Sequence, residues 1–422
     1  MKSKVRFTFA FDRACRTAVA ALIASLDSVS GEDCARVIRA VPYERLREID
    51  FDPDIVEFIC MSAMTRNFPG RAEALAALKE RHGGAFRSII GGPHASGDPR
   101  GALEAGFDYC CMGEGEEAIR DIFDCAATGL EIEGIGGVFE LRDGEVVGRA
   151  REDSADLDGF DPLPRRVRFP TYIEVGRGCR WGCAYCQTPR IFGPTERFRS
   201  PELIEDMARH YVKWEMRDVR LLLPNALAYG STRPGRAEPA ALDEMLGRVR
   251  ASCHGARVYL GSFPSEVRPD YVTPEAVAVL KKHVCNESLV IGGQSGSDRV
   301  LRWLKRGHAV DDIRRALDVV RAGGFEASVD LMLGFPVEEP EDRQATFDLA
   351  RELGAKGARV NMHFLMPLPG TPLSGAAPRF LTGDERRKLD RLAQQGIVRG
   401  HWRKQEETAR EWLDRETQDP NA

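Results

Sequence analysis

The sequence predicts an α/β protein with two successive domains and a short tail. Two series of short β-like runs alternate with amphipathic helical runs, one before residue 130 and one from residue 172 onwards. Glycine-rich turns follow several β-like runs, as in parallel sheets whose ligands bind beyond the carboxyl ends of the strands. The length of 422 residues also favours two or three domains over a single core.

The first series predicts a Rossmann-like (doubly wound) domain over residues 1–150. A hairpin is expected within residues 136–148, around Arg142-Asp143-Gly144, and residues 151–168 read as a linker. The alternating runs are Val5–Ala10, Ala14–Leu26, Ala35–Ala40, Asp54–Met61, Arg71–Arg81, Arg87–Ile90, Gly101–Ala105 and Asp108–Cys111.

The second series predicts a partial (β/α)6 barrel over residues 169–372, followed by a helical C-terminal extension over residues 373–422. The expected strands are Tyr172–Val175, Val219–Leu223, Val258–Gly261, Ser288–Gly292, Ala327–Leu333 and Arg359–Phe364. The expected helices between them are Pro201–Val212, Pro239–Ala251, Pro274–His283, Asp311–Ala322 and Glu341–Leu353.

Composition narrows the class of partner. A net charge of −5 gives no basic stripe for a phosphate backbone, so nucleic acid is not the expected partner. No apolar run reaches the ~18 residues of a membrane span, and the amino terminus lacks a secretory cleavage pattern. The expected location is therefore the cytoplasm, without a membrane partner.

Three of the eleven cysteines carry the strongest signal. Cys179, Cys183 and Cys186 lie on one loop with C-x3-C-x2-C spacing, while the other eight are scattered among apolar residues as expected of buried thiols. Three thiolates can hold three irons of a [4Fe–4S] cube, whereas structural zinc normally needs four ligands. The fourth iron could then chelate S-adenosylmethionine (SAM). A zinc site with a distant fourth ligand, or three idle thiols, are the alternatives.

This loop resembles the signature of the radical SAM superfamily, in which an aromatic residue commonly precedes the last cysteine, as Tyr185 does here. Four later segments resemble, in order, the strand-end motifs of that family's barrel: 261–266, 291–297, 330–336 and 366–372. The resemblance implies cleavage of SAM to a 5′-deoxyadenosyl radical, with electrons from a one-electron reductant such as ferredoxin or flavodoxin.

The same resemblance implies SAM contacts. Ser265, Gln294 and Ser295 are expected at the methionyl or ribose part of SAM, and the backbone near Met366 at its adenine. The family's usual Gly-Gly-Glu is replaced by residues 224–227, so Asn225 is expected to hold the SAM amino group. The family often has Glu where this chain has Gln294.

The first domain resembles the cobalamin-binding domain that precedes the barrel in one branch of radical SAM proteins, through segments 60–65, 91–94 and 113–116. Gly92 stands where a cobalt-binding motif would have Asp, so His94 is expected to be a turn residue and not a cobalt ligand. Positive charge on Arg66 could discourage a lower ligand. The residues expected near cobalamin are Ser62, Met64, Thr65, Arg66, Gly91, Gly92, His94, Gly113, Glu114 and Gly115.

Together the resemblances imply a cobalamin-dependent radical SAM C-methyltransferase in which one SAM gives methylcobalamin and a second is the radical source. Two alternatives remain: a radical SAM enzyme catalysing a rearrangement or cyclisation without methylation, and a non-catalytic corrinoid or iron–sulfur carrier. A methylthiotransferase is less favoured, because such enzymes usually carry extra cluster cysteines upstream and a small C-terminal β-barrel.

The overall pattern is most similar to a branch from methane-producing archaea that includes the glutamine C-methyltransferase of methyl-coenzyme M reductase. This similarity implies a peptidyl glutamine substrate and therefore a post-translational modification. Tyr229, Asn361, His363 and Trp402 are strand-end or tail residues that could line the substrate channel.

Overall fold

The computed structural model describes residues 4–30, 33–263 and 265–418, which divide into two units. The first contains the described residues up to 174 together with Arg190–Gly193 and His210–Met216; the second contains the remainder. Pro264 of the predicted motif 261–266, and the ends of the predicted ranges 1–150 and 373–422, lie outside the described residues.

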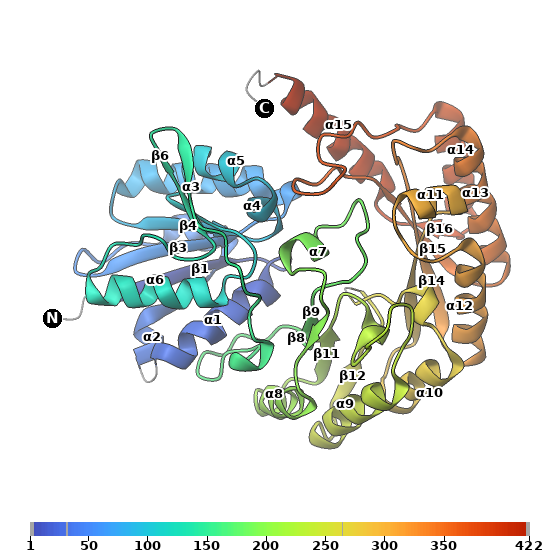
Figure 1. Cartoon of the computed structure of the whole chain (residues 1–422), viewed down its shortest axis with the longest axis horizontal. Coiled ribbons are helices and arrows are strands. Elements are labelled where there is room, and N and C mark those ends of the chain that lie inside the picture. Colours follow the sequence, from blue (N-terminus) through green and yellow to red (C-terminus); the bar gives the residue numbers. More distant parts are fainter. Residues whose placement is uncertain (1–3, 31–32, 264, 419–422) are drawn as a thin grey trace. The chain divides into compact units, whose positions relative to one another are not determined.

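A seven-stranded sheet of order β2-β1-β3-β4-β5-β6-β7 forms the first unit (Figure 1). The first five strands in this order are parallel, and β6 and β7 form an antiparallel hairpin. Asp143 (φ 51°) and Gly144 (φ 81°) both adopt the left-handed conformation that a two-residue hairpin needs, as predicted. The strands are β1 Val5–Phe11, β2 Ile38–Pro42, β3 Val56–Ser62, β4 Arg87–Gly91, β5 Tyr109–Cys111, β6 Val138–Arg142 and β7 Glu145–Gly148.

Helices connect the parallel strands, which confirms the doubly wound prediction. The central strand β3 is an almost continuous apolar run because it is buried on both faces, and Phe58 stacks on Phe7 of β1 with ring centroids 4.8 Å apart. The helices are α1 Arg16–Ser30, α2 Cys34–Val37, α3 Phe68–His82, α4 Pro93–Gly97, α5 Pro99–Glu104 and α6 Glu116–Thr128.

The predicted barrel strands form two sheets, β12-β11-β8 and β13-β14-β15-β16. All of these strands except β8 lie in the second unit. The segment around Val267 links the two sheets, because its N–H donates to the Val290 carbonyl at 2.8 Å while the Val290 N–H donates to the Gly261 carbonyl at 3.0 Å. The strands are β8 Ile173–Glu174, β9 Gly176–Arg177, β10 Arg197–Phe198, β11 Asp218–Leu222, β12 Arg257–Tyr259, β13 Ser288–Gln294, β14 Glu326–Leu333 and β15 Arg359–Phe364.

Helices between these strands match the predicted order, and Figure 1 shows α9, α10, α12 and α13 on the outer side of the strands. α9, α10 and α13 each begin with Pro, which is favoured there because the N–H groups of a first helical turn have no acceptor within the helix. The helices are α7 Thr188–Ile191, α8 Pro201–Lys213, α9 Pro239–Ser252, α10 Pro274–His283, α11 Asp298–Trp303, α12 Val310–Ala322 and α13 Pro340–Ala355.

The described part of the tail is mainly helical, as predicted, and contains one short strand that the sequence did not predict. Between α14 (Gly383–Gln394) and α15 (Trp402–Gln418), the short strand β16 (Val398–Arg399) pairs in parallel with β15. Val398 is buried against this sheet, and Gly396 (φ 73°) ends α14 in the left-handed conformation. The sheet edge therefore supplied a partner that local sequence could not reveal.

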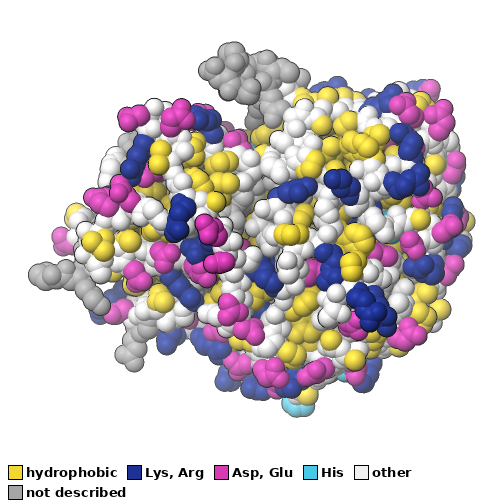
Figure 2. All heavy atoms as spheres, viewed as in Figure 1, with side chains coloured by type: hydrophobic (Ala, Val, Ile, Leu, Met, Phe, Trp, Pro, Cys, Tyr) yellow, Lys and Arg dark blue, Asp and Glu magenta, His cyan; other side chains and the backbone are white. Residues whose placement is uncertain are grey.

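No helix among the described residues is long and apolar enough to cross a membrane. Lys and Arg side chains are interspersed with Asp and Glu over the face shown in Figure 2.

Candidate functional site

The three predicted ligands lie on the loop that follows β9. Gly178 (φ 82°) allows the chain to turn directly after the strand, and the Cys186 N–H donates to the Cys183 carbonyl at 3.1 Å. The Ala184 N–H donates to the Leu304 carbonyl at 3.0 Å, so the loop is fixed to the segment after α11. The Cys183 thiol is buried, whereas Cys179 and Cys186 are partly exposed.

The donor set fits an iron–sulfur cluster. Burial first, and then the neighbouring thiols, raise the pKa of Cys179 to about 11, so the thiolate form needs nearby positive charge. The Trp181 N–H donates to the Cys179 sulfur, and the Thr188 N–H and hydroxyl donate to that of Cys186. No three His, Cys, Asp or Glu side chains among the described residues surround a single ion; in a cubane each thiolate binds a different iron.

Arg306 lies at the centre of the site. Its guanidinium donates to the Cys183 sulfur at 3.6 Å, the Tyr185 hydroxyl at 3.2 Å and the Gly292 carbonyl at 2.7 Å. It also donates to Nε2 of His308 at 3.2 Å, and burial together with the nearby arginines lowers the pKa of His308 to about 3. The Tyr185 ring is packed in an apolar cluster beside the loop.

Polar side chains from β13, from the segment after β12 and from the segment after α11 converge at Gly292 of β13. A Cβ there would lie 3.2 Å from Nε2 of Gln294, 3.3 Å from Nη2 of Arg306 and 3.4 Å from Oε2 of Glu266. Gln294 itself is buried with φ +70°, a conformation that costs energy in a residue other than glycine. The structure therefore brings Gln294 close to the arginine that contacts the cysteine loop.

A second polar group extends along β14 and β15. Burial and the neighbouring Asp330 carboxylate raise the pKa of Glu266 to about 8. Asn361 donates to Asp330 at 2.6 Å, and Nε2 of His363 is 3.6 Å from the same carboxylate, which raises the pKa of His363 although burial lowers it. Gln405 of α15 lies 3.5 Å from Nδ1 of His363.

Asn225, which follows β11, is 2% exposed. Its Oδ1 accepts the Arg268 N–H at 3.1 Å, which fixes the amide orientation and leaves Nδ2 as a buried donor without a hydrogen-bond partner among the described residues. The Ser265 hydroxyl, unlike Nδ2 of Asn225, already has hydrogen-bond partners: it accepts the Leu223 N–H at 3.1 Å and donates to the Leu223 carbonyl at 2.8 Å. Ser265 therefore braces the end of β11.

The other two predicted SAM contacts, Ser295 and Met366, lie in different segments of the barrel. The Ser295 hydroxyl lies 3.4 Å from that of Thr346 and accepts the Ser297 N–H at 3.2 Å, so it organises the turn between β13 and α11. Met366 is half-buried in the segment after β15. Gln187 of the cysteine loop donates to the Pro369 carbonyl at 2.8 Å, which ties that segment to the loop.

In the first unit, the residues predicted near cobalamin gather at one edge of the sheet. The Ala63 N–H donates to the Gly91 carbonyl at 3.0 Å, and the His94 N–H donates to the Ala63 carbonyl at 2.9 Å, which joins the ends of β3 and β4. Gly92 has φ +90°, and a Cβ there would lie 2.5 Å from Oγ of Ser62. Only glycine fits this close approach.

His94 is buried in the first turn of α4. Its Nδ1 lies 3.4 Å from the Thr65 hydroxyl, its ring centroid is 4.0 Å from that of Phe68, and burial lowers its pKa to about 4. The imidazole is therefore neutral and packed within its own unit. Met64 and Arg66 are exposed beside it.

The turn after β5 completes this edge. The Gly113 N–H donates to the Ser96 hydroxyl at 3.0 Å, and Glu114 accepts the Ala155 N–H at 2.6 Å. A Cβ on Gly115 would lie 3.1 Å from Leu22. Glu114 is thus used to hold the segment after the hairpin.

Sequence reasoning missed two buried arginines. Arg71 of α3 donates to the Ser62 carbonyl at 3.3 Å, pairs with Asp12 and lies 3.8 Å over the Tyr43 ring, so it braces the loop after β3. Arg306 is the second. Each is one of many arginines in a helical or loop segment, and no local pattern distinguished them.

The four residues predicted to line a substrate channel fall into two groups. Asn361 and His363 belong to the polar group on β14 and β15, whereas Tyr229 donates its hydroxyl to the Arg199 carbonyl at 2.7 Å. Trp402 is 2% exposed. Tyr229 and Trp402 are therefore packing residues.

Family comparisons match both units. The model of the radical SAM superfamily matches residues 173–350, and the model of the B12 binding domain matches residues 36–123. The chain thus carries a B12-binding domain followed by a radical SAM domain, as predicted. These domains imply a [4Fe–4S] cluster, SAM and cobalamin as cofactors.

Solved structures support the same two-domain fold. The radical SAM methyltransferase TsrM from Kitasatospora setae, with cobalamin and a [4Fe–4S] cluster bound, aligns with a TM-score of 0.70 at 16% identity, over 89% of this chain and 74% of that chain. The cobalamin-dependent radical enzyme OxsB, with aqua-cobalamin and SAM, gives 0.64 at 13% identity, over 82% and 52%.

Curated relatives are tRNA-2-methylthio-N(6)-dimethylallyladenosine synthases. The protein from Chlorobium phaeovibrioides is 32% identical over 46% of this chain and 42% of its own length, and that from Thermus thermophilus is 33% identical over 53% and 45%. The chain spans about half the length of the curated relatives that it matches.

Proposed function

We propose that this chain, in which a B12-binding domain precedes a radical SAM domain, is a cobalamin-dependent radical SAM methyltransferase that methylates an unactivated sp3 carbon. The observation that carries the proposal is the hydrogen-bonded cysteine triad, in a chain that also has a B12-binding domain. When bound, the cluster supplies the electron that cleaves SAM, and cobalamin supplies the methyl group.

The chain's own residues bind the cluster and orient SAM. Cys179, Cys183 and Cys186 hold three irons. Arg306 places positive charge beside the Cys183 sulfur, and the Thr188 N–H donates a hydrogen bond to the Cys186 sulfur. Because Nδ2 of Asn225 can only donate, Asn225 suits the SAM carboxylate better than the amino group. This refines the contact expected from sequence.

We further propose a peptidyl glutamine substrate in methyl-coenzyme M reductase, with a ferredoxin- or flavodoxin-type reductant. The support is the sequence pattern described above. The strand-end group of Asp330, Asn361 and His363 also offers both donors and acceptors, which a primary amide requires. Reduced thiols and an iron–sulfur cluster suit a reducing compartment, so we propose the cytoplasm.

tRNA methylthiolation is the second candidate, because the curated relatives named above carry that activity in their names. Two observations disfavour it here. Burial raises the pKa of the upstream thiols Cys60, Cys110 and Cys111, which lie on β3 and β5 inside the sheet. The described part of the tail forms α14, β16 and α15, and not the small β-barrel expected of such enzymes.

The test is anaerobic reconstitution with iron, sulfide and hydroxocobalamin, followed by incubation with SAM, a strong reductant and glutamine-containing peptides from methyl-coenzyme M reductase. We expect the peptide to gain the mass of one CH2 group while S-adenosylhomocysteine and 5′-deoxyadenosine form. The Cys183→Ala variant should lose all three products, whereas Cys253→Ala, which removes a buried thiol at the end of α9, should keep them.

Other outcomes separate the alternatives. 5′-Deoxyadenosine with an unmethylated rearranged product would favour a non-methylating radical enzyme. A methylthio group on a tRNA substrate would replace our proposal by the second candidate. A preparation with intact cluster and cobalamin that forms no 5′-deoxyadenosine would indicate a carrier.

A further inference from the structure

Arg306 is a buried cation without a carboxylate partner. It is 7% exposed, and no Asp or Glu among the described residues lies within ion-pair distance of its guanidinium. Burying an unpaired charge is costly unless an anion or strong acceptors compensate it. Glu266 and Asp270 act on this side chain only from beyond ion-pair distance, so the guanidinium lacks an anion in direct contact.

Its hydrogen-bond partners narrow the source of a compensating negative charge. The Gly292 carbonyl and the Tyr185 hydroxyl are neutral, and Nε2 of His308 must be unprotonated because it accepts the Arg306 Nε–H at 3.2 Å. The remaining partner is the Cys183 sulfur, at 3.6 Å from Nη1. Among these four partners, only this sulfur becomes anionic by binding iron.

Two further contacts hold Arg306 in place. Arg268 donates to the Arg306 carbonyl, and its guanidinium lies 3.9 Å from the centroid of the Trp181 ring, which belongs to the cysteine loop. The Ala184 N–H bond to Leu304 fixes the same segment from the other side. The guanidinium therefore has a defined position relative to the Cys183 sulfur.

We propose that Arg306 is a positioning residue that sets the reduction potential of the cluster, through its charge and its N–H donor on the Cys183 thiolate. An electron entering a thiolate-bound cluster adds negative charge, and a fixed cation at the sulfur lowers the cost of that addition. Arg306 thus makes the cluster easier to reduce. The inference rests on the proposed function only through the presence of the cluster.

The experiment is a redox titration of the reconstituted full chain, with the reduced cluster measured by electron paramagnetic resonance. In Arg306→Gln, we expect the ratio of reduced to oxidised cluster at a fixed poise to fall about tenfold, which corresponds to about 59 mV for a one-electron couple. Arg306→Lys, which keeps the charge but not the planar fork, should show a smaller fall. Arg343→Gln, at a buried arginine whose ion pairs are with Glu338 and Glu385, is the matched control and should titrate as wild type.

An Arg306→Gln chain with an intact cluster and the wild-type potential would overturn the proposal. Should that variant fail to assemble a cluster, Arg306→Met decides, because it also removes the charge and an unchanged potential there would overturn the proposal. The measurement needs no methyl acceptor, so a potential shift without methylation would reject the proposed function alone. A wild-type chain that assembles no cluster would reject both.

Discussion

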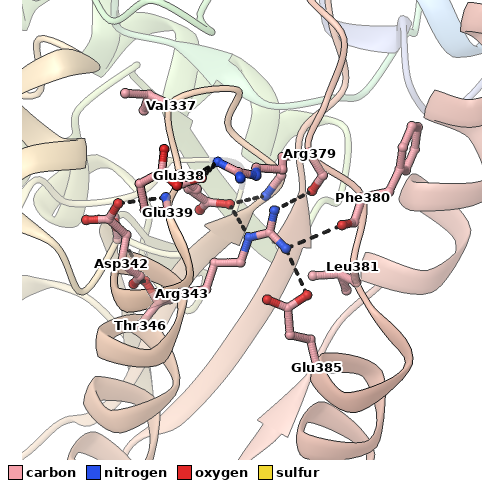
Figure 3. Close-up of polar contacts among 12 residues, drawn as sticks. Val337, Glu338, Glu339, Asp342, Arg343, Thr346, Arg379, Phe380, Leu381 and Glu385 are labelled. Carbon is pink, nitrogen blue, oxygen red and sulfur yellow. Dashed lines mark hydrogen bonds and ion pairs between the residues drawn. The ribbon is translucent and has the colours of Figure 1, made fainter.

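Replacing Glu338 by glutamine should remove a pH dependence from the free energy of unfolding of the second unit. Glu338 is 0% exposed, and its Oε2 accepts the Gly334 N–H at 2.9 Å and Nε of Arg343 at 3.3 Å (Figure 3). Its Oε1 is buried and has no hydrogen-bond partner in the part of the chain that the structure describes. Burial consequently raises the pKa of Glu338 from 4.5 to about 7, although Gly334 and Arg343 lower it.

The magnitude follows from this change of pKa. At about 1.4 kcal/mol per pH unit, a folded-state pKa of about 7 against 4.5 when unfolded corresponds to about 3 kcal/mol. Because the folded pKa is the higher one, the stabilisation is complete below pH 4.5 and is lost as the pH rises through about 7. Glutamine does not titrate, so Glu338→Gln should gain up to about 3 kcal/mol on wild type over this window.

The assay is urea unfolding of wild type and variants at a series of pH values between about 5 and about 8. Asp342→Asn, in the first turn of α13, is the matched control. Hydrogen bonds, from Arg299 first and then from Ser297, lower the pKa of Asp342 to about 2 although burial raises it, so that residue stays ionised across the assay. The free energy of unfolding of this variant should differ from that of wild type by a nearly constant amount, because Asp342 contributes only weakly to the raised pKa of Glu338. A constant difference for Glu338→Gln as well would refute a raised pKa.

Two glycine substitutions, one in each unit, test the geometry of the candidate sites. Gly92→Ala should unfold at lower urea and retain less cobalamin than Gly106→Ala, because both adopt positive φ but only the Cβ at Gly92 meets neighbouring atoms, an overpacking worth about 1–3 kcal/mol. Equal loss in the two variants would mean that backbone strain alone matters. Gly307→Ala should lower the iron content after reconstitution, because its Cβ would overlap the Trp181 ring of the cysteine loop. Gly396→Ala, at positive φ with open space around it, should bind iron as wild type does, and a similar loss there would contradict this reasoning.

Local patterns allowed most of the secondary structure to be predicted. The hairpin at Asp143-Gly144 and helix α10, which begins at Pro274 as predicted, depend on short-range backbone preferences that neighbouring residues determine. β16 was missed because a two-residue strand has almost no periodicity, and its partner β15 is 38 residues away.

The candidate site also has a part that the sequence predicted and a part that only the tertiary structure decided. The cysteine spacing lies within one loop, so the sequence by itself identified the triad and the chemistry that three thiolates support. The roles of Ser265, Asn225 and Arg306 depended on contacts with residues far along the chain: Ser265 bonds to Leu223, Asn225 to Arg268, and Arg306 to a cysteine 123 positions earlier. Only packing of the barrel decides which side chains meet at the strand ends, because hydrogen-bond partners separated by whole β/α units leave no local pattern in the sequence.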